Sequence, residues 1–162
     1  MKETILPDSE SLHEVVIPKE NAVFWMDDQG RWCNAYGRFI HKRIIDHFNR
    51  SMGHDKDGYF VAQVRGDTRE KVYFHYADTP LFAVRVTLET PVHLVLNTQR
   101  VIPLSPDLLF SRSDQLYQRM GDEIIRFGDR ALMAISAYLE DTPEGLVIQI
   151  DGRKTRIPEM PA

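Results

Sequence analysis

Basic side chains are concentrated in one short stretch of this otherwise acidic chain. The stretch contains Arg38, His41, Lys42, Arg43, His47 and Arg50. Arginine and lysine near the first turn of a helix add to the positive end of the helix dipole and suit a phosphate or a carboxylate. We therefore predict Arg38, Lys42 and Arg43 as ligands of an anion. The alternative is a solvated helix face that pairs with Asp46 and with the acidic loop after it.

A second basic set recurs at spacings of seven, seven and four residues. It consists of Arg112, Arg119, Arg126 and Arg130. On the helix expected in this region, such spacing places guanidinium groups on one stripe, and Arg119 and Arg126 are predicted to line a cleft between two lobes. The alternative is pairing with the acidic residues interspersed among them, which are Asp114, Asp122, Glu123 and Asp129.

Metal-binding patterns are incomplete in this sequence. Residues 54–58 combine two carboxylates with a glycine, but a calcium loop also needs a glutamate six residues after that glycine, where Val64 stands. Turn chemistry is the preferred interpretation of the segment. The six histidines show no HxH, HExxH or Cys-His spacing. No metal and no cofactor is predicted.

Catalytic patterns are missing as well. The chain has no Gly-x-Ser-x-Gly and no glycine-rich phosphate loop, and Cys33 is expected in a hairpin strand beside Trp32 rather than at a helix N-terminus. The sequence therefore favours a protein that is not an enzyme. The rival is an enzyme whose residues converge only in the folded chain, for example a hydrolase that uses His75 and Asp78.

Composition restricts the class of protein further. Of 162 residues, 43% are hydrophobic and 27% charged, as in ordinary globular domains. The formal net charge of −4 disfavours nucleic acid as the main partner. A single cysteine, a start without the basic-then-apolar form of a leader, and apolar runs of strand length predict a cytoplasmic chain with no membrane partner.

The elements that must position these residues are mainly strands, with a few helices. Runs of β-branched and aromatic residues between turn residues predict strands at 23–26, 31–34, 59–64, 71–76, 82–88, 93–96, 100–103, 146–150 and 153–157. The strands within 59–88 are expected to be antiparallel neighbours. Apolar spacings of three to four predict helices at 40–52, from Ser113 to Phe127, and at 129–140.

An internal echo suggests that the chain contains two related lobes. The order aromatic-Gly, helix, acidic-Gly, strand starts at Tyr36 and again at Phe127. We predict an α+β fold with a mainly antiparallel sheet and two small related lobes packed together. The expected divisions are an N-terminal arm at 1–20, a β-rich lobe with one helix at 21–104, and a helical lobe ending in a β-hairpin at 105–162.

Several turn and packing motifs between residues 23 and 150 resemble those of one bacterial family. The motifs are Asp28-x-Gly30-x-Trp32, Gly37-x-x-Ile40, Asp57-Gly58-Tyr59, Ala77-Asp78-Thr79-Pro80-Leu81-Phe82 and Tyr117-x-Arg119. They resemble domain-of-unknown-function family number twelve-eighty-five (DUF1285). The resemblance implies two consecutive small α/β lobes and a role in ligand binding or signalling, and it supplies no catalytic residue.

Together these observations predict a non-enzymatic regulatory protein, or one that binds a small anionic ligand. The predicted partner is a small anionic molecule or another protein, with Trp25 and Tyr36 as aromatic side chains expected to be exposed. A third class is a protein-protein interaction module. Such a module would assemble as a homo-oligomer through the strand near Pro103 or through the C-terminal hairpin.

Overall fold

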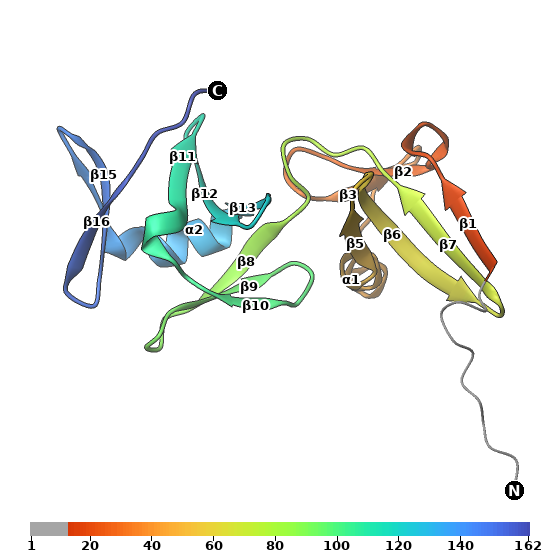
Figure 1. Cartoon of the computed structure of the whole chain (residues 1–162), viewed down its shortest axis with the longest axis horizontal. Coiled ribbons are helices and arrows are strands. Elements are labelled where there is room, and N and C mark those ends of the chain that lie inside the picture. Colours follow the sequence, from red (N-terminus) through yellow and green to blue (C-terminus); the bar gives the residue numbers. More distant parts are fainter. Residues whose placement is uncertain (1–12) are drawn as a thin grey trace, which may run out of the picture. The chain divides into compact units, whose positions relative to one another are not determined.

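The computed structural model describes residues 13–162, which fall into two compact units. Unit 1 ends at Ala77 and unit 2 begins at Asp78. Strands dominate both units and most strand pairs are antiparallel, so the predicted α+β class is confirmed (Figure 1). The sequence had placed the boundary at residue 104 instead. The boundary between the units lies earlier in the chain because residues 82–103 form strands that belong to the main sheet of unit 2.

Within residues 13–77, unit 1 contains two sheets, one α-helix and a 3-10 turn at Lys19–Asn21. Its elements are β1 (His13–Ile17), β2 (Phe24–Met26), β3 (Trp32–Asn34), β4 (Gly37–Arg38), α1 (Lys42–Arg50), β5 (Met52–Asp55), β6 (Gly58–Arg65) and β7 (Thr68–Tyr73). The small sheet has the order β2-β3-β4 and the larger one β1-β7-β6-β5. Strand β1 comes from the expected N-terminal arm and runs parallel to β7. The rest of that arm, residues 1–12, lies outside the described residues.

Aromatic side chains join the helix of unit 1 to its sheets. Trp32 of β3 lies 5.3 Å from Phe48 of α1 and 4.8 Å from Phe74, ring centre to ring centre, in edge-to-face geometry. Trp32 is fully buried, and its Nε1 donates a hydrogen bond of 2.7 Å to Asn49 Oδ1. The predicted helix at 40–52 is confirmed, although Met52 already belongs to β5.

Unit 2 is larger and also contains two sheets. Its elements are β8 (Phe82–Thr87), β9 (His93–Leu96), β10 (Val101–Pro103), β11 (Leu109–Arg112), β12 (Gln115–Met120), β13 (Glu123–Phe127), α2 (Asp129–Ile135), β14 (Leu139–Thr142), β15 (Gly145–Ile150) and β16 (Arg153–Ile157). The sheets have the orders β10-β9-β8-β13-β12-β11 and β14-β15-β16. Completely buried aliphatic side chains form its core, among them Leu94, Ile125, Ile135 and Ile148.

The helix predicted from Ser113 to Phe127 is wrong, because this segment is the hairpin β12–β13. Ser113 and Asp114 have φ angles of 49° and 63°, which end β11 in a turn, and Gly121 (φ 62°) reverses the chain between β12 and β13. Buried positions alternate along β13, where Ile125 and Phe127 face inward.

Two smaller expectations also change. The helix predicted at 129–140 ends as α2 at Ile135, is followed by a 3-10 turn at Ser136–Tyr138, and gives way to β14. Strands β7 and β8 are not neighbours, since β7 pairs with β6 and β1, whereas β8 pairs with β9 and β13. The predicted hairpins at 23–34 and 146–157 are confirmed as β2–β3 and β15–β16.

The internal echo corresponds to a shared topology. Each unit contains a three-stranded meander, then a helix, then a second three-stranded meander: β2-β3-β4, α1 and β5-β6-β7 in unit 1; β11-β12-β13, α2 and β14-β15-β16 in unit 2. The registers after the helices match as well, because Met52 pairs with Val61 and Leu139 with Ile148.

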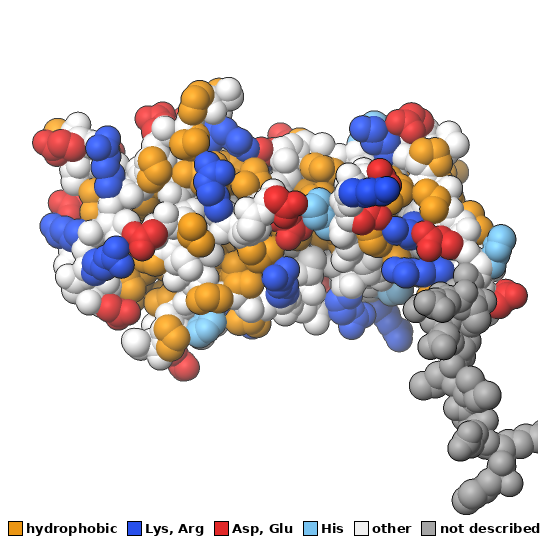
Figure 2. Space-filling view, in the orientation of Figure 1, with side chains coloured by type: hydrophobic (Ala, Val, Ile, Leu, Met, Phe, Trp, Pro, Cys, Tyr) orange, Lys and Arg blue, Asp and Glu red, His pale blue; other side chains and the backbone are white. Residues whose placement is uncertain are grey.

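Large apolar side chains remain at the surface of both units, where Figure 2 shows them among charged groups. In unit 1 the most exposed are Val23, Tyr36 and Ile40, and in unit 2 they are Met133 and Val101. Trp25, which is 40% exposed, and Tyr36 were expected at the surface from the sequence, and the structure agrees.

Candidate anion-binding site

One face of the hairpin region in unit 2 carries three arginines and two aromatic rings. Register pairs Phe110 of β11 with Tyr117 of β12, and Tyr117 with Arg126 of β13. Side chains alternate along a strand, so Arg112 shares the face of Phe110, and Arg119 shares that of Tyr117. We call these five residues the arginine face.

The rings orient the guanidinium groups. Phe110 and Tyr117 stack with ring centres 5.0 Å apart and planes 8° from parallel. Arg119 Cζ lies 4.6 Å from the centre of the Phe110 ring, and Arg112 Cζ lies 4.9 Å from that of Tyr117. A guanidinium this close to a ring centre gains a cation–π attraction that helps to fix its position, and its N–H groups can still bind an anion.

The carboxylate that contacts the arginine face comes from Asp78, at the start of unit 2. Its two oxygens accept hydrogen bonds from Arg112 and from the Tyr117 hydroxyl. Burial, and then the hydrogen bond to Asp78, raise the pKa of the Tyr117 hydroxyl. Both oxygens of Asp78 are thus engaged, which leaves the hydrolase alternative built on His75 and Asp78 without support from this geometry.

Neighbouring contacts hold Asp78 in place. The Thr79 hydroxyl is buried and donates to the carbonyl of Ile124 at 2.8 Å, while the Leu81 amide donates to the same hydroxyl at 3.2 Å. The Asn97 side chain donates to the carbonyl of Pro80 at 2.9 Å. The segment that carries Asp78 is therefore tied to the main sheet of unit 2.

The structure brings together Arg119 and Arg126, two of the residues predicted from the sequence, and adds Arg112. They share a strand face, not the predicted stripe of a helix, and Arg130 lies apart on α2. Arg126 Cζ is 5.6 Å from the centre of the Phe82 ring on the adjacent strand β8. Asp78 pairs with Arg112, and within residues 13–162 no carboxylate lies within ion-pair distance of Arg119, so this face carries positive charge that Asp78 does not neutralise.

The other predicted ligands, Arg38, Lys42 and Arg43, lie at the entry to α1 in unit 1. Arg38 lines a hollow of about 300 Å³ together with Tyr36 and Ile40. Lys42 pairs with Asp46 at 3.1 Å, as the solvated-face alternative expected, and its side chain is 90% exposed. Arg43 is also exposed.

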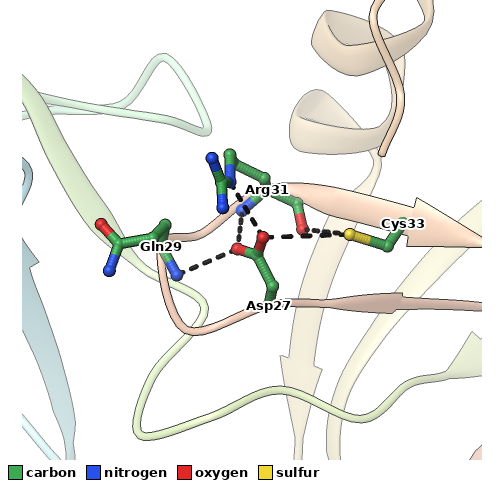
Figure 3. A network of polar contacts seen from close by, with 4 residues as sticks. All are labelled: Asp27, Gln29, Arg31 and Cys33. Carbon is green, nitrogen blue, oxygen red and sulfur yellow. Dashed lines mark hydrogen bonds and ion pairs between the residues drawn. The ribbon is translucent and has the colours of Figure 1, made fainter. Parts of the chain in front are cut away.

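Polar contacts elsewhere in unit 1 stabilise turns. Asp27 accepts hydrogen bonds of 2.9 Å from the amides of Gln29 and Arg31 and from Arg31 Nε, and it lies 3.9 Å from Cys33 Sγ (Figure 3). Burial, and then the Asp27 carboxylate, raise the pKa of the Cys33 thiol. A raised pKa means less thiolate near neutral pH, and hence a less reactive cysteine.

The former calcium candidate at 54–58 is a turn stabilised by Asp55. Its Oδ1 accepts the Asp57 amide at 2.9 Å, and its Oδ2 accepts hydrogen bonds from Lys71 Nζ at 2.6 Å and the Tyr73 hydroxyl at 2.7 Å. These bonds hold the pKa of Asp55 at about 2, with the Lys71 bond as the main cause and the Tyr73 bond next.

Three residues were not assigned to this site from the sequence. They are Asp78, whose carboxylate pairs with Arg112, and Phe110 and Tyr117, whose rings lie against the arginines. Alternation between residues 110 and 119 was the available signal, because aromatic and basic side chains recur there at every second position on each strand.

The fold and the site define a two-unit α+β protein with an arginine-rich strand face. No protein-family model and no curated protein matches the chain. Its structure is similar to that of a DUF1285 family protein from Silicibacter pomeroyi, with a TM-score of 0.61 and 9% identity over 96% of this chain and 89% of that chain. The predicted resemblance to DUF1285 is thus confirmed at the level of the fold.

A second DUF1285 family protein, from Shewanella baltica, matches with a TM-score of 0.49 and 15% identity over 68% of this chain and 87% of that chain. The family name denotes a domain of unknown function, so these matches assign no activity. Separately, none of the helices within residues 13–162 is long and apolar enough to cross a membrane.

Proposed function

We propose that this chain binds a small anionic molecule on the arginine face and acts as a non-enzymatic regulatory protein in the bacterial cytoplasm. The observation that carries the proposal is the placement of Arg112, Arg119 and Arg126 on one strand face, with Asp78 paired to Arg112 and no carboxylate of the described residues within ion-pair distance of Arg119. The single cysteine, which cannot form a disulfide within the chain, supports the cytoplasmic part of the proposal.

The geometry favours a compact anion with more than one negative oxygen. Arg119 is exposed and its guanidinium lies over the Phe110 ring, which is itself 2% exposed, so the cation–π contact restrains Arg119 while its side chain stays accessible. Arginine binds phosphate and carboxylate oxygens in pairs, and several such groups on one face select a multivalent ion over chloride. A phosphate ester or a di- or tricarboxylate has the required chemistry.

Arg38, Lys42 and Arg43 stay a prediction as ligands of an anion. They belong to unit 1, and the contacts described above support anion binding at the arginine face of unit 2 alone. The proposal therefore assigns the ligand to Arg112, Arg119 and Arg126, and the same binding experiment tests the unit 1 residues through the double variant Arg38→Gln/Lys42→Gln.

The test is isothermal titration calorimetry with pyrophosphate, citrate and a nucleoside monophosphate, supported by thermal unfolding. We expect at least one of these anions to bind, and Arg119→Gln to weaken it by about tenfold or more, the factor set by about 1.4 kcal/mol. Arg100→Gln removes an exposed arginine elsewhere in unit 2 and should leave binding unchanged. If no anion binds, or if both variants weaken binding equally, the arginine face is not the site.

A further inference from the structure

Tyr36 and Ile40 form an exposed apolar patch next to the basic entry of α1. Tyr36 is 99% exposed and Ile40 is 76% exposed. Both line the hollow of about 300 Å³ that also contains Arg38 and Ile44. We call Tyr36, Arg38, Ile40, Lys42 and Ile44 the unit 1 patch. Exposed aromatic and aliphatic side chains beside cations are typical of interaction surfaces.

A second hollow, in unit 2, has the opposite charge. It measures about 430 Å³ and has an apolar floor of Leu116, Leu132, Leu139, Leu146 and Ile157. Four carboxylates lie around this floor, from Asp114, Asp141, Glu144 and Glu159, with Arg156 as the basic residue among the lining side chains. We call this site the acidic hollow.

The carboxylates of the acidic hollow lack cationic partners. Within residues 13–162, no lysine, arginine or histidine lies within ion-pair distance of Asp114, Asp141, Glu144 or Glu159. Four like charges around an apolar floor repel one another, and a cation that approaches them relieves this repulsion. The occupant therefore combines an apolar body with positive charge.

We infer that the unit 1 patch of one copy of this chain docks into the acidic hollow of unit 2 of a second copy. Tyr36 and Ile40 supply the apolar body, and Arg38 and Lys42 supply the positive charge that Asp141 and Glu144 lack. Tyrosine and arginine are among the residues that dominate interface energies. The two surfaces differ, so the contact is heterologous and joins unlike faces of successive copies.

The acidic hollow is separate from the arginine face. Ser111 and Leu116 line the hollow, and they alternate along β11 and β12 with Phe110, Arg112 and Tyr117 of the arginine face. Ser111 and Leu116 thus lie on the opposite face of these strands, whereas Gln115, the first residue of β12, shares the face of Tyr117 and also lines the hollow. None of the five residues of the arginine face lines the hollow. Self-association does not rest on anion binding, and each can fail without the other.

Sedimentation velocity of the full chain tests the contact, first as a function of protein concentration at low and physiological salt. We expect the mean mass to rise with concentration and the association to weaken with salt, because the contact is partly electrostatic. Tyr36→Ala should weaken the association by about tenfold or more, as loss of a central interface tyrosine does. A chain that stays monomeric at every concentration and salt would overturn the inference.

Charge reversal tests the pairing of the two surfaces. Arg38→Glu/Lys42→Glu and Asp141→Lys/Glu144→Lys should each abolish self-association, and an equimolar mixture of the two variants should form a complex because the reversed surfaces match. Lys19→Glu and Glu89→Lys make the same changes on exposed residues outside both surfaces and should associate as the unmodified chain does. Circular dichroism confirms the fold of each variant.

Two results would contradict this inference: a mixture of the two reversed variants that stays monomeric, or controls that lose association equally. Anion titration of the same variants separates the two proposals. Arg119→Gln should keep self-association, and Asp141→Lys/Glu144→Lys should keep anion binding if that proposal also holds.

Discussion

Gly58 and Gly145 adopt the same backbone angle, φ +124°, at the same place in the two units. Each begins the middle strand of the meander that follows the helix, and each pairs across its turn, Gly58 with Asp55 and Gly145 with Thr142. This backbone conformation is one that residues with a Cβ rarely adopt. The shared topology of the two units therefore includes the detailed geometry of this turn.

Replacing either glycine by alanine should destabilise the protein through backbone strain. A Cβ built on Gly58 meets no atom within 4 Å, so the cost comes from the φ angle alone. We expect Gly58→Ala to lower the free energy of unfolding by about 1–3 kcal/mol, measured by urea denaturation. Lys56→Ala, in the same turn, should change it by less than about 0.5 kcal/mol. Equal stability of the two variants would contradict the strained turn.

The hydrogen bonds to Asp55 predict a loss of stability at acidic pH. Its pKa is about 2 in the folded protein, against an ordinary value of 3.8, because Lys71 and Tyr73 stabilise the carboxylate. A lowered pKa stabilises the fold above the ordinary value, and this stabilisation disappears as the pH falls from about 4 to about 2. Urea denaturation at several pH values should show this decline.

The matched variants are Asp55→Asn and Asp57→Asn, which remove neighbouring carboxylates of one turn. Asp55→Asn should be less stable near neutral pH and should lose less stability between pH 4 and pH 2 than the unmodified protein, because its amide does not titrate. Asp57→Asn should follow the unmodified protein. An Asp55→Asn curve parallel to that of the unmodified protein would show that this carboxylate is not the source of the decline.

Local turn signals made much of the fold predictable. The hairpins β2–β3 and β15–β16 were identified from Asp27-Asp28-Gln29-Gly30 and from Asp151-Gly152, because these residues favour tight reversals. The helix prediction for residues 113–127 was wrong because apolar residues recur there at spacings of four, four and three, which fit a helix as well as a hairpin. These residues are Leu116, Met120, Ile124 and Phe127. The positive φ angles of Ser113 and Asp114 turn the chain and so favour the hairpin. The spacing of apolar residues gives no information about these angles.

The candidate site was only partly predictable. The sequence placed Arg119 and Arg126 on one stripe of a helix, whereas the structure places them on one strand face, because β12 pairs with β13. Asp78 contacts Arg112 from 34 residues away along the chain, and such a long-range pairing has no local signal. The exposed position of Tyr36, in contrast, was predicted from the sequence and is confirmed.

The environment of Cys33 predicts a slowly reacting thiol. The Asp27 carboxylate lies 3.9 Å from its sulfur, and burial together with this charge raises the thiol pKa (Figure 3). Alkylation by iodoacetamide at pH 8 should therefore be slower than for a free cysteine, and Asp27→Asn should accelerate it severalfold. Asp28→Asn changes the adjacent carboxylate as a control. Acceleration by both variants alike would show that general loosening of the turn, not the charge of Asp27, controls the thiol.

Asp78 competes with an external anion for Arg112, so its removal should strengthen anion binding. Asp78 has a φ angle of 47°, which asparagine tolerates nearly as well as aspartate, so Asp78→Asn changes the charge without straining the backbone. With the carboxylate gone, the Arg112 guanidinium no longer divides its N–H groups between Asp78 and the ligand. We expect the affinity of the best anion to rise by about tenfold, which corresponds to about 1.4 kcal/mol.

Calorimetric titration measures this rise, and a second ion pair of unit 2 provides the control. Asp107 contacts Arg153 at 3.1 Å on the surface, so Asp107→Asn also converts a paired aspartate to an amide. It should leave anion affinity unchanged and should lose at most about 1 kcal/mol of stability, as exposed ion pairs do. Equal anion affinities of Asp78→Asn and the unmodified chain would show that the anion binds without Arg112. An equal gain of anion affinity in Asp107→Asn would show that the change in net charge causes the effect. A gain confined to Asp78→Asn identifies its carboxylate as the internal competitor of the ligand.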